Sequence, residues 1–477
     1  MPMAANRIPL AQMWDRLPAE WPDDPRAEIR RELQRIDQKV VVLDDDPTGT
    51  QTVHDVPVLT DWSVPFLTEE FSNDLPCFYI LTNSRSMPLS QARDLNRRIG
   101  RNLGEAAHRA ARRFVAMSRS DSTLRGHFPG EVYALCEGLG IQPDAVLLIP
   151  FFLEGGRYTL GDVHYVADGE WLVGAGETQS ARDPVFGYRA SNLREWVEEK
   201  TGGEVPAAAV RSVSLEDIRL GGPTRVAARL KALCSGAVCI VNCASVRDLE
   251  VFTLGLLEAE AAGKSFLYRT AASLVPVRCG MTPKPLLSRS EIRFNGRGGL
   301  IVAGSYVQRT TSQLELLFRE TDVKGVEVEA DALIDESTRP AVIRSIAEQA
   351  TRFLAQDTDV ALFTSRKLLV QSNVADSLLA GQKISSAIVE IVRSIRVRPR
   401  YILAKGGITS SDIATKALNV KRAIVRGQIL PGVPVWELGS ESAYPGLPFI
   451  VFPGNVGDAG AVAEVVTLWR SCSTAVQ

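Results

Sequence analysis

The hydrophobic pattern of the chain alternates between short apolar runs and longer helical stretches. In the first part of the chain, the apolar runs of strand length lie at 39–44, 77–82, 112–118, 144–150, 236–243 and 265–270. Helix-like stretches, such as Leu89 to Arg109 and Leu249 to Ala262, lie between them. A strand-then-helix rhythm is typical of parallel sheets that are covered by helices on both faces.

A segment with two prolines and several charges, 281–298, interrupts this rhythm, and a second alternating series follows it. The second series has its apolar runs at 299–305, 323–330, 359–365, 400–407 and 449–455. The pattern therefore predicts an α/β protein with two three-layer αβα domains, mainly parallel sheets and an interdomain cleft. The expected parts are an N-terminal extension (1–37), a first domain (38–280), a linker (281–298) and a second domain (299–477).

Composition narrows the class of protein. With 477 residues the chain is too long for one ordinary core, which agrees with two domains. The 54 basic and 56 acidic residues give a net charge of −2, so we expect neither nucleic acid nor a membrane as partner. Charges and prolines break up the first 25 residues, which favours neither a signal peptide nor a membrane span. Seven cysteines without a metal-binding spacing are typical of reduced thiols in a cytoplasmic protein.

Polar residues follow three of the first-domain strands directly. The candidates are Asp44, Asp45 and Asp46 after the first run, Ser84 and Arg85 after the second, and Arg119, Ser120, Asp121, Ser122 and Arg125 after the third. In open α/β sheets, ligands bind beyond the carboxyl ends of the strands. Guanidinium groups bind carboxylates, and aspartates accept hydrogen bonds from hydroxyls, so these loops predict a small hydroxylated anion as ligand. A set of capped helices with satisfied surface charges is the alternative explanation.

Glycines follow strands of the second domain in a similar way. The candidates are Gly304 and Ser305, then Gly406 and Gly407, and finally Gly454, Asn455, Val456, Gly457 and Asp458. Glycine lets the backbone approach an anion closely, and helix N-termini point N–H groups at it. Three such strand ends indicate a nucleotide phosphate site, although neither a P-loop nor a GxGxxG motif is present.

A second interpretation concerns Asp44, Asp46 and Thr48, which form a DxDxT motif after an apolar strand. This motif is the first signature of haloacid-dehalogenase-type phosphatases, in which Asp44 would attack phosphorus. The last acidic motif of such an enzyme would then lie in the other domain. This spacing counts against a phosphatase, because the phosphatase core is one compact domain.

The motifs together resemble the four-carbon acid sugar kinases, from about Lys39 to about Leu468. The resemblance rests on DDPTG at 45–49, DSTLRG at 121–126, RTAAS at 269–273, and the glycine loops at 304–305, 406–407 and 454–457. DSTLRG is the specific motif. Three departures from the common pattern affect the expected substrate more than the reaction class. They are the extended first motif, PGNVGD as the last loop, and the N-terminal extension.

This resemblance implies ATP-dependent phosphorylation of a tetronate, such as threonate, erythronate or 3-oxo-tetronate, with ATP and Mg²⁺ as cofactors. The expected partners are the sugar acid and ATP. A homo-oligomer of the chain is compatible with the sequence. Asp45 or Asp46 is the expected base, and Asp458 is the competitor for that role. The acid is expected at Asp45, Ser84, Arg85, Arg119, Ser120, Asp121, Ser122 and Arg125, and ATP at Ser305, Gly406, Gly407, Gly454, Asn455, Val456 and Gly457. A phosphatase using Asp44 and a non-catalytic sensor are the alternatives.

Overall fold

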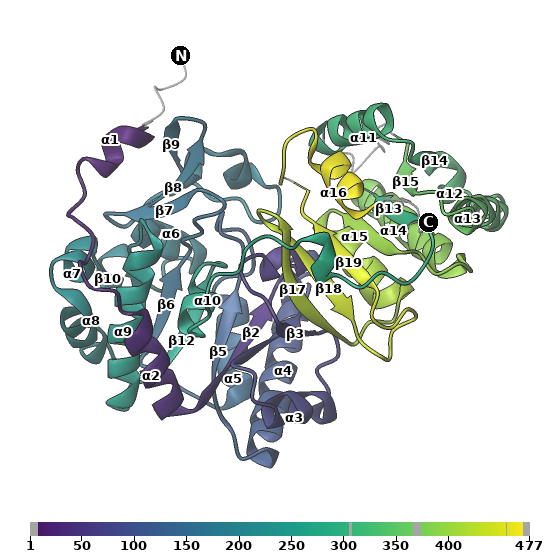
Figure 1. Ribbon diagram of the computed structural model, residues 1–477. Helices are drawn as coiled ribbons and strands as arrows, with labels where there is room; N and C mark the ends of the chain where they lie inside the picture. The colour runs from purple at the N-terminus through teal and green to yellow at the C-terminus, as the bar shows by residue number, and fades with distance from the viewer. Residues whose placement is uncertain (1–7, 305–307, 366–373, 455, 471–477) are drawn as a thin grey trace. The chain divides into compact units, whose positions relative to one another are not determined.

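The computed structural model describes residues 8–304, 308–365, 374–454 and 456–470. The chain forms two compact units, Met1–Pro283 and Lys284–Gln477 (Figure 1). Each unit has its own sheet and its own hydrophobic core. This architecture confirms the predicted α/β fold class.

The first unit is built on a parallel sheet with the order β10-β11-β6-β12-β5-β2-β4-β3. In that order the strands are Arg211–Val213, Ala237–Val241, Ala145–Ile149, Phe266–Thr270, Arg113–Arg119, Gln38–Asp44, Cys77–Leu81 and Val56–Leu59. All described neighbours within this sheet pair in the parallel sense. The six apolar runs that sequence analysis assigned to strands are all strands here, whereas β3 and β10 were not predicted.

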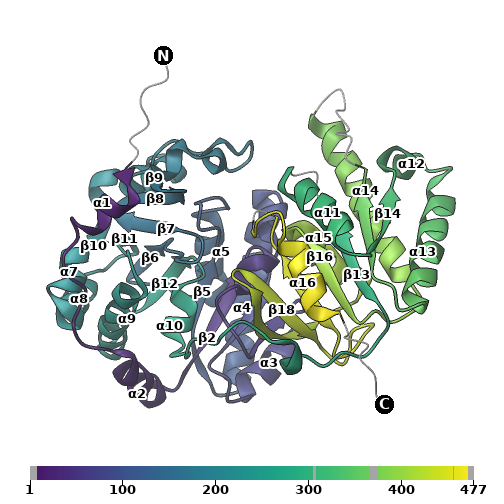
Figure 2. The same cartoon turned by 45° about the horizontal axis from the view of Figure 1, so that its top comes forward.

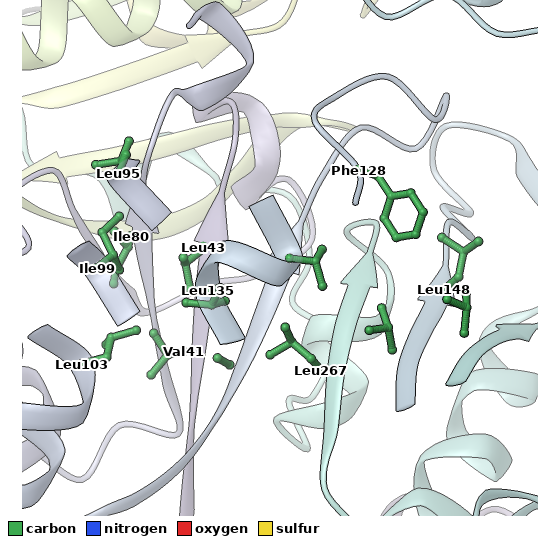
Figure 3. Close-up of a cluster of buried hydrophobic side chains, with 14 of the residues drawn as sticks. Val41, Leu43, Ile80, Leu95, Ile99, Leu103, Phe128, Leu135, Leu148 and Leu267 are labelled. Carbon is green, nitrogen blue, oxygen red and sulfur yellow. The ribbon is translucent and has the colours of Figure 1, made fainter. Parts of the chain in front are cut away.

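Helices cover both faces of this sheet. The helices of this unit are α1 (Leu10–Trp14), α2 (Arg26–Ile36), α3 (Val64–Ser72), α4 (Leu89–Arg109), α5 (Gly130–Leu139), α6 (Leu193–Lys200), α7 (Leu215–Arg219), α8 (Gly222–Lys231), α9 (Val246–Ala261) and α10 (Leu274–Arg278). Val41 and Leu43 point to the face that α4 and α5 cover (Figure 3). Since successive side chains of a strand alternate, Val40 and Val42 point to the opposite face. The helix predicted from Leu89 to Arg109 has those bounds in α4.

A small antiparallel sheet that sequence analysis did not predict belongs to the same unit. It has the order β1-β9-β8-β7, with the bounds Ile8–Pro9, Trp171–Gly174, Val163–Asp168 and Arg157–Leu160. Strand β1 lies in the predicted N-terminal extension and pairs with β9. Strand β8 contributes His164, which reaches the loop after β5.

The sheet of the second unit has the order β17-β18-β19-β16-β13-β15-β14. In that order the strands are Arg422–Leu430, Val433–Leu438, Pro448–Phe452, Tyr401–Lys405, Gly299–Ala303, Val360–Thr364 and Lys324–Val328. Strand β18 is antiparallel to both β17 and β19, and the other described pairs are parallel. The hairpin of β17 and β18 turns at Pro431 and Gly432, and sequence analysis did not predict it.

The helices of the second unit are α11 (Gln308–Glu320), α12 (Ala330–Ile334), α13 (Arg339–Ala355), α14 (Val374–Ser394), α15 (Gly407–Asp412) and α16 (Ala461–Trp469). Helices α11 and α16 share a hydrophobic cluster with β13, β16 and β19. Figure 2 shows these two helices beside each other. Helix α13 packs against β14 and β15, and α14 packs against α12 and α13.

Two further findings concern the described residues as a whole. None of their helices combines the length and the apolar character that crossing a bilayer requires. The six cysteines in the described ranges are free, and Cys77, Cys239, Cys243 and Cys279 are buried. Cys234 is exposed, because it lies after the end of α8 rather than within the strand that follows.

Candidate active site

The register of the first sheet brings the predicted site loops together. Asp44 at the end of β2 lies opposite Leu81 of β4 on one side and Arg119 of β5 on the other. Arg119 in turn lies opposite Thr270 of β12. The carboxyl ends of these four strands are therefore level, and the loops that follow them meet at one edge of the sheet.

Asp44 is a buried member of this cluster. It is 2% exposed, and its Oδ1 lies 3.2 Å from Nη1 of Arg119, which is also buried. Its other oxygen leaves no room for a side chain at Gly49, where a Cβ would lie 1.9 Å from Oδ2. Burial, together with the charges of Asp45 and Asp46, raises the pKa of Asp44 to about 7. Arg119 therefore holds one oxygen of Asp44, whereas Oδ2 is buried and has no hydrogen-bond partner among the described residues.

Arg85 connects the next two aspartates. Its Nη2 lies 3.1 Å from Oδ1 of Asp45 and 3.2 Å from Oδ2 of Asp46. Asp46 also accepts hydrogen bonds from the Thr48 amide at 2.9 Å and hydroxyl at 2.6 Å. By contrast, Oδ2 of Asp45 is buried and has no hydrogen-bond partner among the described residues. Burial raises the pKa of Asp45, so this oxygen is a natural proton acceptor.

Asp121, in the loop after β5, binds three side chains through one carboxylate oxygen. Its Oδ2 accepts hydrogen bonds from the Thr123 hydroxyl at 2.5 Å and from Nε of Arg125 at 2.6 Å, and Nη1 of Arg85 lies 3.7 Å away. Although burial opposes the charge, Arg85 and Arg125 hold the pKa of Asp121 well below its usual range. Asp121 is therefore ionised, and it accepts hydrogen bonds at neutral pH.

Three side chains from other elements fix the backbone of this loop. The Tyr188 hydroxyl donates to the Thr123 carbonyl at 2.6 Å, and Nη2 of Arg269 donates to the Arg125 carbonyl at 3.1 Å. His164 is fully buried, which lowers its pKa to about 4 and keeps the ring neutral at pH 7. Its Nε2, 2.8 Å from the Ser122 carbonyl, must therefore carry the proton. Sequence analysis selected none of the three as a site residue, because each is distant from the loop along the chain, although Arg269 begins the RTAAS motif at 269–273.

Arg269 differs from the other arginines of the site. It is 1% exposed, and its Nε and Nη1 have no hydrogen-bond partner in the described part of the chain. Its guanidinium carbon lies 5.6 Å from the ring centroid of the buried Trp196. Arg85, Arg119 and Arg125 are each paired with an aspartate, whereas no described carboxylate lies within ion-pair distance of Arg269. A buried guanidinium with spare donors indicates a site for an anion.

Other polar groups of the site are also buried. Glu131, which sequence analysis did not select, has its pKa raised to about 7 by burial and by the charge of Asp45. The hydroxyls of Ser84 and Thr82 lie 3.0 Å apart. Ser84, Ser120 and Ser122 are all buried. Their contacts with the acid stay predictions.

The glycine loops of the second unit also meet. Lys405 of β16 lies opposite Ala303 of β13 and Phe452 of β19, so the loops after these strands are neighbours. At Gly454 a Cβ would contact no atom of the described residues within 4 Å, so these residues leave open space beside the backbone. Gly457 has a φ of 77°, and a Cβ there would lie 2.4 Å from that of Ala461.

The remaining predicted residues of the second unit have varied surroundings. Gly406 precedes α15, and Gly407 is its first residue. Val456 packs against the hydrophobic cluster. Asp458 is exposed, and its Oδ1 accepts a hydrogen bond from the Gly460 amide at 2.9 Å, so its catalytic role stays a prediction. Ser305 and Asn455 lie outside the described residues. Within the described ranges, no group of three or more His, Cys, Asp or Glu side chains could hold a metal ion.

Two models of known protein domains match the sequence of this chain. Residues 40–278 match the model of a sugar-binding N-terminal domain, and residues 300–462 match that of a nucleotide-binding C-terminal domain. A 3-oxo-tetronate kinase of Pseudomonas fluorescens is 26% identical over 338 residues, which cover 67% of this chain and 71% of that protein.

Two solved structures are similar in fold. A Salmonella typhimurium LT2 protein described as a tRNA synthase has a TM-score of 0.66 at 15% identity, over 90% of this chain and 98% of its own. A Haemophilus influenzae protein with a domain of unknown function has a TM-score of 0.60 at 18% identity, over 90% and 99%. At these identities the likeness shows the fold alone. The domain matches, which span most of the sequence, show that the chain belongs to the family of four-carbon acid sugar kinases and is a carbohydrate kinase.

Proposed function

We propose that the protein transfers the γ-phosphoryl group of ATP to a hydroxyl of a tetronate-like acid, such as threonate, erythronate or 3-oxo-tetronate. The observation that carries the proposal is a pair of buried, unsatisfied groups beside the same loop. One is Oδ2 of Asp45, which could accept a proton, and the other is the guanidinium of Arg269, which could bind a carboxylate. The name of the Pseudomonas fluorescens relative, a 3-oxo-tetronate kinase, supports this substrate class.

Asp45 is the proposed base of the reaction. Phosphoryl transfer to an alcohol requires a group that orients the hydroxyl and accepts its proton. One oxygen of Asp45 binds Arg85, which fixes the carboxylate, while the other oxygen has no described partner. Asp46 and Asp121 would accept hydrogen bonds from the remaining hydroxyls. Both are partly exposed at this edge of the sheet.

Arg269 is the proposed receptor for the carboxylate of the acid. Arg85, Arg119 and Arg125, which sequence analysis assigned to this role, already have aspartate partners. Arg269 has two unpartnered nitrogens that could form a charge-assisted pair of hydrogen bonds. Asp45 and Asp121 are close enough to act on the pKa of Arg269. The carboxylate and the reacting hydroxyl of a four-carbon acid would therefore lie in one site.

The nucleotide is proposed to bind the glycine loops of the second unit, around Gly406, Gly407, Gly454 and Gly457. Open space beside Gly454 and the adjacent strand ends support this assignment. Mg²⁺ usually keeps several waters and binds through substrate phosphates, so it would enter with ATP and neutralise charge on the transferred group.

The substitution Arg269→Lys tests the substrate class. It keeps the charge and loses the planar pair of donors, which together contribute about 1.5–3 kcal/mol to binding of a carboxylate. We expect the KM for the best tetronate to rise about tenfold to a hundredfold. The KM for erythritol, which has no carboxylate, should not change. The assay is steady-state ADP release with each acceptor at saturating ATP.

Arg278→Lys is the matched control, since Arg278 is equally buried but pairs with Glu260. It should change neither KM. Equal losses for tetronate and erythritol in the Arg269 variant would show that Arg269 only supports the loop.

A further inference from the structure

Lys405 is a buried cation at the glycine-loop edge of the second sheet. It ends β16 and is 1% exposed. Its Nζ donates to the carbonyl of Pro453 at 2.7 Å and to that of Gly454 at 3.4 Å, and it lies 4.2 Å from the ring centroid of Phe452. No described carboxylate lies within ion-pair distance of it. A buried ammonium without a counter-charge is costly, so it indicates a function for that charge.

The surroundings of Lys405 show where a counter-charge could come from. Its amine contacts the loop at Gly454, which has open space beside its backbone. The opposing strand residues, Ala303 and Phe452, are uncharged. In a nucleotide-binding domain, the anion that approaches such a loop is a polyphosphate.

We propose that Lys405 is a phosphate-binding residue, which supplies its ammonium to the β- or γ-phosphate of the nucleotide held by the glycine loops. This inference rests on the proposed function and adds a residue that the glycine pattern does not identify. The two carbonyls hold the amine at the loop, and a third N–H is left for a phosphate oxygen.

Phosphate binding at Lys405 has a consequence for protons. Burial, and then the charge of Arg309, lowers the pKa of Lys405 to about 7. A bound polyphosphate favours the charged form and raises that pKa again. Above pH 7 the free protein holds mainly the neutral amine, so nucleotide binding takes up a proton there. Affinity for the nucleotide therefore falls as the pH rises above 7.

The charged groups on the elements next to Lys405 do not supply a counter-charge for its ammonium. Arg309 on α11 repels the ammonium, and its Nη1 lies 3.3 Å from the Gly457 carbonyl. Asp412 on α15 is paired with Lys416 at 2.7 Å. Asp458 after β19 accepts its hydrogen bond from Gly460.

The test is isothermal titration of the full-length protein with ADP and with adenosine, at pH 7.5 in buffers of different ionisation enthalpy. We expect ADP binding to take up protons and adenosine binding to take up none. Lys405→Met should weaken ADP binding about tenfold to a hundredfold, leave adenosine binding unchanged and abolish the proton uptake. Lys324→Met, at an exposed lysine of β14, is the control and should match the wild type.

Each other outcome has a distinct meaning. Wild-type protein that binds ADP no more tightly than adenosine would overturn the proposal, even if the Lys405 variant did not fold. Equal losses for ADP and adenosine would show that Lys405 only ties β16 to the next loop. A wild-type protein that binds no nucleotide would refute the proposed function itself.

Discussion

Replacement of Asp45 by asparagine is expected to lower kcat by about a hundredfold to ten-thousandfold, the usual contribution of a general base. The amide retains the shape of the side chain but cannot accept the proton of the sugar hydroxyl. The KM for the acid should change much less, because Asp46 and Asp121 keep their hydrogen-bonding oxygens. Steady-state ADP release with the acid and ATP varied in turn measures both parameters.

The pH dependence of turnover is a second readout of the same role. Burial raises the pKa of Asp45, and the base must be deprotonated to act. The wild-type kcat should therefore fall as the pH falls through a value above that of an ordinary aspartate. Asp168→Asn, on the exposed end of β8, is the matched control and should leave kcat unchanged. An Asp45→Asn variant with wild-type kcat would move the base to Asp46 or Asp458.

Arg119→Met is expected to lower the free energy of unfolding by about 3–5 kcal/mol, because it leaves Asp44 buried without its partner. The double variant Asp44→Asn/Arg119→Met should recover much of that loss. Arg109→Met, which breaks an exposed pair with Glu105, should cost about 0.5 kcal/mol at most. Urea unfolding of the variants provides the comparison, and additive losses in the double variant would contradict the pairing.

The same pair has a predictable response to pH. The folded-state pKa of Asp44, about 7, lies above its unfolded value. Stability from this group is therefore fully present below the unfolded pKa and is lost as the pH rises through 7. Loss of Arg119 removes the charge that opposes this trend, so Arg119→Met should destabilise the protein more at pH 8 than at pH 5.

The sequence predicted most of the sheet architecture because parallel strands that are buried on both faces are continuous apolar runs. Strand β2, with its residues buried from Lys39 to Asp44, illustrates this. The hairpin of β17 and β18 was missed because the alternating burial of β17 is a weaker signal than a continuous run. Strands β7 to β9 have only four to six residues each, so their apolar content does not separate them from loops.

Proximity within each site could be predicted, whereas the partners of individual side chains could not. The strand-end rule brought Asp45, Asp121 and Arg85 together, as the ion pairs confirm. That Arg119 pairs with Asp44, and that Arg269 and Lys405 have no carboxylate partner, depends on tertiary contacts between distant segments. The domain boundaries, the interdomain cleft, and the roles of Ser305 and Asn455 stay predictions.

Phosphorus NMR of a reaction mixture tests the central claim most directly. The full-length protein is incubated with ATP, Mg²⁺ and, in separate samples, threonate, erythronate and 3-oxo-tetronate. The proposed function predicts a new phosphomonoester signal with at least one acid, in equal amount to the ADP formed, and a weaker signal with erythritol at matched concentration. Release of inorganic phosphate from sugar-acid phosphates without ATP, and no phosphomonoester from any of the acids, would contradict it and favour a hydrolase.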